Sequence, residues 1–143
     1  FEHILNQDEV LKLGQNHLLI EMSYYQPSIN FEPAVDKIKS KQLFPVLAHP
    51  ERYLFLHKQQ GKYNYYKSLG ITFQLNMLSL SGYYGPDVKK MALKLVKQKQ
   101  IDFIASDVHN LSHLASLRDN LTIPKDILPV LNAIIDRTIS TFY

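Results

Sequence analysis

The sequence predicts an α/β fold in which parallel strands alternate with helices. Short apolar runs typical of buried strands alternate along the chain with segments of helical periodicity, which favours parallel pairing through right-handed crossovers. Polar residues follow four of these runs at intervals of 28, 27 and 31 residues: Glu21, His49, Asn76 and Asp107. A (β/α) barrel of roughly 250 residues uses about 31 residues for each of its eight units. Each interval therefore fits one strand and one helix.

The chain length fits only part of such a barrel. Its 143 residues hold about four or five units, whereas a closed barrel needs about eight. The chain also begins at Phe1 without a methionine and ends directly after a helical stretch. We therefore expect residues 1–143 to form a single domain, the C-terminal part of a barrel that lacks its N-terminal strands.

The four predicted strands are compact apolar runs bounded by polar or turn residues. They are His17–Met22, Phe44–Ala48, Ile71–Leu75 and Ile101–Ser106.

The predicted helices rest on apolar spacing and on end signals. Val88, Met91, Ala92, Leu95 and Val96 follow the spacing of one helix face. Asn30 suits an N-cap, Gly14 and Gly70 suit helix ends, and Pro124 suits a helix start. Helices are expected over His3–Leu13, Phe31–Gln42, Tyr53–His57, Tyr63–Leu69, Val88–Val96 and Pro124–Ile139, with another starting near Asn110.

Composition excludes several classes of protein. The chain is 45% apolar and 20% charged, a balance typical of globular domains. It has no cysteine, which excludes disulfide scaffolds, zinc ribbons and thiol nucleophiles and is compatible with a cytoplasmic location. A net charge of +3 is too small to indicate nucleic-acid binding. No apolar run approaches the roughly 20 residues that insertion into a membrane requires.

Candidate site residues lie where the predicted strands end. The carboxyl ends of parallel strands form the functional edge of α/β folds, and here they carry Glu21, His49, Asn76, and Asp107 with His109. Carboxylates and imidazoles together are ligands for manganese, iron or zinc. Such metals activate water and neutralise phosphoryl charge.

Two short motifs supply most of these residues. Pro50 is expected to hold His49 in extended geometry, and Arg52 has the fork that binds phosphate, or else pairs with Glu51 or Asp107. In an extended segment Asp107 and the residue two positions later share a face, so both can reach one metal cluster.

The segment Asn76–Gly85 is open to two interpretations. Its small polar residues, Ser79 among them, suit a loop that shapes a substrate pocket, but they equally suit a plain connection capped by Asn76 or Ser81. Tyr83 can stack on an aromatic substrate, or it can pack half-buried as many tyrosines do.

Four segments, in order, resemble the PHP-domain (polymerase and histidinol phosphatase) bacterial protein-tyrosine phosphatases of capsule and exopolysaccharide operons. They are Leu18–Ser23, Pro45–Tyr53 (PVLAHPERY), Gln74–Gly82 and Phe103–Asn110 (FIASDVHN). The family begins with a His-x-His motif, which this sequence does not contain. We therefore expect this truncated chain to be inactive alone.

The resemblance implies a partial distorted (β/α) barrel of PHP type with a cluster of divalent metal ions, first of all Mn²⁺, with iron or zinc as alternatives. It implies hydrolysis of phosphotyrosine on a tyrosine kinase that regulates capsular or exopolysaccharide synthesis. By motif, the metal ligands are Glu21, His49, Asp107 and His109. Arg52 contacts the phosphate and, with His49, is catalytic. Asn76, Ser79 and Tyr83 are the remaining substrate-binding candidates.

Two other interpretations remain open. A different PHP-type phosphoesterase acting on a small phosphate ester carries a similar metal site. A non-catalytic fragment is the second alternative, because an open half-barrel exposes a sheet edge that favours association into a homo-oligomer.

Overall fold

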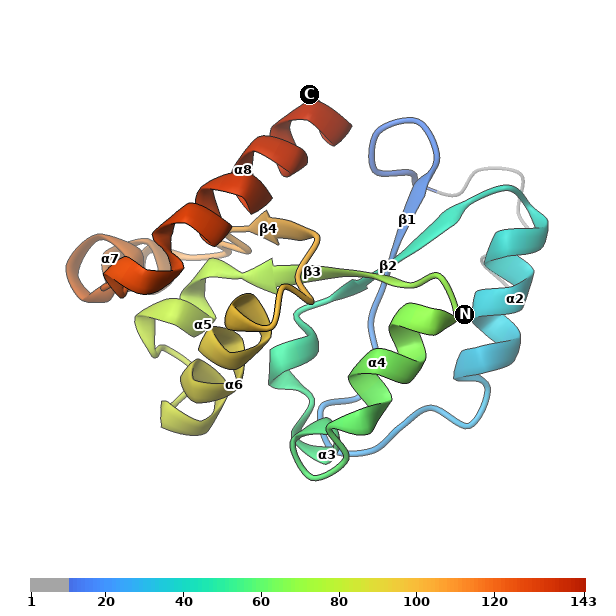
Figure 1. Ribbon diagram of the computed structural model, residues 1–143, viewed down its shortest axis with the longest axis horizontal. Helices are drawn as coiled ribbons and strands as arrows, with labels where there is room; N and C mark the ends of the chain where they lie inside the picture. Colours follow the sequence, from blue (N-terminus) through green and yellow to red (C-terminus); the bar gives the residue numbers. More distant parts are fainter. Residues whose placement is uncertain (1–10) are drawn as a thin grey trace.

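The computed structural model describes residues 11–143, which form a four-stranded sheet flanked by helices (Figure 1). All three strand pairs are parallel, and the order β1-β2-β3-β4 follows the chain. This is the strand order of consecutive barrel units, and the predicted α/β class with parallel strands is confirmed. The strands are β1 (His17–Ile20), β2 (Phe44–Ala48), β3 (Thr72–Asn76) and β4 (Phe103–Ala105).

Helices occupy every connection between the strands. They are α2 (Phe31–Ser40), α3 (Leu54–His57), α4 (Gly61–Ser68), α5 (Met77–Ser81), α6 (Pro86–Lys97), α7 (Leu111–Asn120) and α8 (Leu128–Phe142), with 3₁₀ turns η1 (Pro50–Arg52) and η2 (Lys125–Ile127). No helix in this described part of the chain has both the length and the apolar character needed to cross a bilayer.

One face of the sheet carries the core. The register places Ile20, Leu47 and Phe73 side by side on neighbouring strands, and all three are buried in the main apolar cluster. Figure 1 shows α2, α4 and α6 on the same side of the sheet. Their apolar stripes, for example Val35 and Ile38 on α2, join that cluster. Burial of this face fixes the register and hence the level at which each strand ends.

The C-terminal helix α8 packs against the amino-terminal ends of strands in the sheet. Phe142 of α8 contacts Phe103, with ring centroids 4.7 Å apart, and His17, at 5.2 Å. Phe44 also contacts the His17 ring, at 5.4 Å. The Ile104 backbone N–H donates to the Thr138 hydroxyl of α8 at 3.1 Å, which gives the edge strand β4 a partner.

Two predicted elements differ in the structure. Of the helix expected over His3–Leu13, residues 1–10 lie outside the described residues, and Leu13 instead pairs with His17 across a tight turn. A short helix, α5, replaces the loop expected at Asn76–Gly85. It forms because the Asn76 side chain accepts a hydrogen bond from the Leu78 N–H at 2.9 Å.

We predict that His17 makes the protein less stable in mild acid. Burial lowers the pKa of His17 below 6.5, so the unfolded chain binds a proton there at a higher pH than the folded chain does. The stability that neutral His17 contributes is therefore complete above about pH 6.5 and is lost as pH falls through the lower folded-state pKa. His17→Phe keeps an aromatic ring but removes the titration. Between about pH 7.5 and 5.5, the free energy of unfolding from urea denaturation should fall more for the parent chain than for this variant; equal falls would contradict the prediction.

Candidate functional site at the carboxyl edge of the sheet

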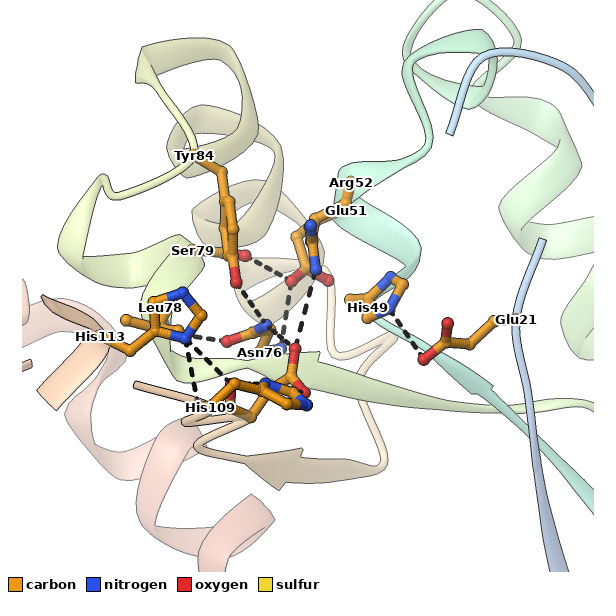
Figure 2. Close-up of polar contacts among 11 residues, drawn as sticks. Glu21, His49, Glu51, Arg52, Asn76, Leu78, Ser79, Tyr84, His109 and His113 are labelled. Carbon is orange, nitrogen blue, oxygen red and sulfur yellow. Dashed lines mark hydrogen bonds and ion pairs between the residues drawn. The ribbon is translucent and has the colours of Figure 1, made fainter. Parts of the chain in front are cut away.

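The predicted strand-end residues gather at one edge of the sheet (Figure 2). Glu21 follows β1, His49 follows β2, Asn76 ends β3 and Asp107 follows β4. The connection after β2 also supplies Arg52, at the end of η1. Because the four strands are parallel and in chain order, the connections that leave them meet side by side.

Glu21 and His49 form the first pair. The His49 Nε2 atom lies 3.3 Å from Glu21 Oε1; the histidine is buried, whereas the carboxylate is 59% exposed. Burial, and then the charge of Arg52, lower the pKa of His49, which outweighs the opposing effect of Glu21. The imidazole is therefore neutral at neutral pH, the form that donates a lone pair to a cation.

The backbone of His49 is left-handed, with φ 37° and ψ 58°, so the expectation of extended geometry is wrong. Its N–H still continues the sheet by donating to the Gln74 carbonyl at 2.8 Å, and its carbonyl accepts from the Arg52 N–H at 2.9 Å. The chain must reverse within one residue to satisfy both bonds, and the following Pro50 disfavours the right-handed helical region. Strained backbone of this kind is held in place by its surroundings and is typical of functional sites.

Arg52 and Asp107 form the second contact across the site. The Arg52 Nη1 atom lies 3.7 Å from Asp107 Oδ2. Of the two partners that the sequence left open, Glu51 and Asp107, Arg52 therefore faces Asp107. The Asn76 amide donates to the same Asp107 oxygen at 2.7 Å while its own oxygen caps α5. Asn76 therefore ties the carboxylate to the end of β3.

His109 comes close to Asp107 through a local turn. Its Nδ1 lies 2.8 Å from the Asp107 carbonyl oxygen and 3.5 Å from Oδ1 of the same residue. Asp107 has φ 51°, so the extended segment expected here is wrong, although the two side chains still meet. The His109 side chain is 70% exposed, and no contact within the described structure joins it to His49.

The two remaining substrate candidates lie at different depths. Ser79 is fully buried, and its hydroxyl donates to Glu51 Oε1 at 2.6 Å, which places it behind the site. Tyr83 is 41% exposed and contacts the rings of Tyr84 and His113, with centroids 5.2 and 4.7 Å away.

Glu51 has a structural importance that the sequence reasoning missed. It is fully buried, and its Oε1 accepts from the Asn76 backbone N–H at 3.1 Å as well as from Ser79. Burial raises its pKa to about 7, and Oε2 has no hydrogen-bond partner among the described residues. A Glu between His49 and Arg52 looks surface-exposed in the sequence, and only the packing of η1 against β3 and α6 buries it.

The donor atoms fit a divalent metal in chemical type but fall short in number. Each of two places offers an imidazole with a carboxylate: Glu21 with His49, and Asp107 with His109. His49 Nδ1 is buried without a partner in the described structure. No three histidine, aspartate or glutamate side chains within residues 11–143 lie close enough to hold a metal ion by themselves.

An open parallel sheet with carboxylates, imidazoles and a guanidinium along its carboxyl edge defines the chain as an α/β domain of the barrel type. Its family follows from sequence comparison. The model of the family described as "Capsular polysaccharide synthesis, CpsB/CapC" matches residues 1–119. The chain belongs to this family.

Relatives of known name agree with this assignment. The tyrosine-protein phosphatase YwqE of Bacillus subtilis (strain 168) is 30% identical over 110 residues, which are 76% of this chain and 43% of YwqE. CapC of Staphylococcus aureus is 27% identical over 93 residues, which are 65% of this chain and 34% of CapC.

A solved structure matches this chain with a TM-score of 0.63 at 27% identity. It belongs to a set of structures of YwqE from Bacillus subtilis and CpsB from Streptococcus pneumoniae, which are described as metal-dependent tyrosine phosphatases. The match covers 81% of this chain and 44% of the solved one. The chain thus spans less than half the length of the relatives it matches.

We predict that Asn76→Ala destabilises the protein by about 1 to 2 kcal/mol, because it removes a helix cap and a hydrogen bond to a carboxylate. Asn30→Ala is the matched control: Asn30 also occupies an N-cap position, but its side chain makes no capping hydrogen bond. It should change the free energy of unfolding by less than about 0.5 kcal/mol. Equal losses for the two variants in urea denaturation would show that the Asn76 side chain does not hold the site.

Proposed function

We propose that this chain is part of a metal-dependent protein-tyrosine phosphatase, and that it supplies a phosphate-binding arginine and some of the metal ligands. The observation that carries the proposal is the position of Arg52. Its guanidinium faces Asp107 at the same sheet edge as the Glu21–His49 pair. Membership of the CpsB/CapC family and the phosphatase names of the relatives support the proposal.

Arg52 would bind the phosphoryl group. Its guanidinium is permanently charged, and its planar fork matches two oxygens of a phosphate monoester. The side chain is only 17% exposed. Low exposure weakens the screening by water, so the attraction between the guanidinium and a phosphoryl oxygen is stronger here than on an open surface.

Glu21, His49, Asp107 and His109 would hold the divalent metal, with Mn²⁺ as the first expectation and iron or zinc as alternatives. When bound, such a metal lowers the pKa of water and offsets phosphoryl charge. We further propose that residues 1–143 are one domain, the C-terminal part of a barrel, and that the remaining donors belong to its N-terminal strands. The chain alone would then lack a complete site.

The substrate would be phosphotyrosine on a protein, and the natural partner a cytoplasmic tyrosine kinase that regulates capsular or exopolysaccharide synthesis. Tyr83 supports an aryl substrate, because its half-exposed ring lies against Tyr84 beside Arg52. Asn76 would orient Asp107 toward the site. Ser79 would not contact the substrate itself but would hold Glu51, beneath the site, in place.

The test is a chimera in which this chain replaces the aligned segment of YwqE. We predict Mn²⁺-dependent release of phosphate from a phosphotyrosyl peptide by the chimera and none by the 143-residue chain. His49→Ala should lower kcat/KM by more than the roughly 10- to 100-fold that loss of an outer-shell partner costs. Arg52→Gln should lower it by about 100-fold or more.

Arg118→Gln is the matched control, since Arg118 is 76% exposed and pairs with its neighbour Asp119. It should leave turnover within about twofold, as expected for a surface change. A folded chimera that lacks metal-dependent turnover, or whose turnover survives His49→Ala, would reject the proposed function. Faster hydrolysis of a small phosphate ester than of the peptide would instead favour the broader phosphoesterase class.

A further inference from the structure

Two aromatic rings lie against the Arg52 guanidinium. Its Cζ atom is 3.8 Å from the centroid of the Tyr84 ring and 4.5 Å from that of Tyr24. Both distances lie well within the range of about 6 Å over which a guanidinium is attracted to an aromatic face. Neither tyrosine belongs to the strand-end carboxylates and imidazoles described above.

The sheet order explains why the rings reach Arg52 from two flanks. Tyr24 lies in the connection after β1, Arg52 in the connection after β2, and Tyr84 follows α5 after β3. Because β2 lies between β1 and β3, the connection that carries Arg52 lies between the other two. The two tyrosines thus come from segments 60 residues apart in the sequence.

Both rings are themselves anchored. The Tyr24 carbonyl accepts from the Leu54 N–H at 3.1 Å, and its ring stacks on the buried Tyr53 at 6.0 Å between centroids. The Tyr84 hydroxyl accepts from the Asn76 amide at 3.4 Å (Figure 2). The rings therefore form a fixed surface against which the guanidinium rests.

The guanidinium N–H groups of Arg52 nevertheless have no hydrogen-bond acceptor among the described residues. The nearest carboxylate oxygen, on Asp107, is 3.7 Å away, which is an ion-pair distance rather than a hydrogen bond. No side-chain hydrogen bond of Arg52 occurs within the described structure, although the residue is only 17% exposed. A largely buried guanidinium with unused donors is arranged to receive an anion.

We propose that Tyr24 and Tyr84 are positioning residues that hold the Arg52 guanidinium between them, so that its N–H groups remain free for two oxygens of a phosphoryl group. This inference rests on the proposed function for the identity of the anion. The rings restrict rotation of the guanidinium before the ligand arrives, which reduces the entropy lost on binding. They also keep water off the faces of the cation, which strengthens its attraction to the anion.

The experiment measures Arg52 directly in the 143-residue chain by NMR. The rate of rotation about the Nε–Cζ bond is read from the side-chain ¹⁵N signals, and affinity is read from their shifts on titration with O-phospho-L-tyrosine. Tyr24→Leu and Tyr84→Leu should each speed the rotation and weaken binding by about 2- to 30-fold, the range expected for a cation–π contact. Tyr24→Phe keeps the ring, its stacking on Tyr53 and its backbone hydrogen bond, and should retain both properties within about twofold.

A series of increasingly fluorinated phenylalanines at position 84 separates the electrostatic role from packing. Fluorine withdraws charge from the ring face while leaving its shape nearly unchanged, so rotation should quicken and affinity should fall stepwise along the series. Leucine variants and fluorinated variants that fold normally and leave the rotation rate unchanged would overturn the inference. Restricted rotation in a chain whose chimera has no phosphatase activity would leave the positioning role standing and reject the proposed function.

Discussion

The site depends on one constraint, the parallel pairing of four strands in chain order. Each strand must end at the same edge of the sheet, so residues from distant parts of the sequence, such as Glu21 and Asp107, leave their strands side by side. Burial of the core face, with Ile20, Leu47 and Phe73 in register, holds that alignment, because a slip of one residue would turn every buried side chain outward. The positions of the polar side chains at the edge therefore depend on the packing of apolar residues one to three positions before them in each strand.

Behind the exposed edge lies a buried polar network that fixes the loops. Glu51 joins the turn after β2 to the first residues of α5, and Asn76 joins α5 to Asp107. His49 and Asp107 both have left-handed backbones, at φ 37° and 51°. Such conformations cost free energy in residues other than glycine and persist only where surrounding contacts determine them. The network thus helps to keep two candidate ligand side chains in positions that their own backbone preferences oppose.

The sequence predicted the parts of the molecule that follow from local periodicity. All four strands and the strand-end residues Glu21, His49, Asn76 and Asp107 could be found from apolar runs and the polar residue that follows each. The left-handed turn at His49 could not, because it results from a hydrogen bond to the neighbouring strand β3. The rings over Arg52 and the burial of Glu51 were likewise missed, since they depend on loops that only the sheet brings together. Motif resemblance proposed the members of the candidate site, and tertiary packing determines how they face one another.

We propose that the loops after β1, β2 and β4 bind divalent cations at two places near Arg52, the Glu21–His49 pair and the Asp107–His109 pair. Addition of Mn²⁺ to the ¹⁵N-labelled chain tests this directly, because the paramagnetic ion broadens the NMR signals of nearby amides. At the lowest Mn²⁺ concentrations we predict that the amides of Glu21, His49, Asp107 and His109 broaden together. Earlier broadening around exposed carboxylates elsewhere, such as Asp119 or Asp126, with these four amides unaffected, would contradict it.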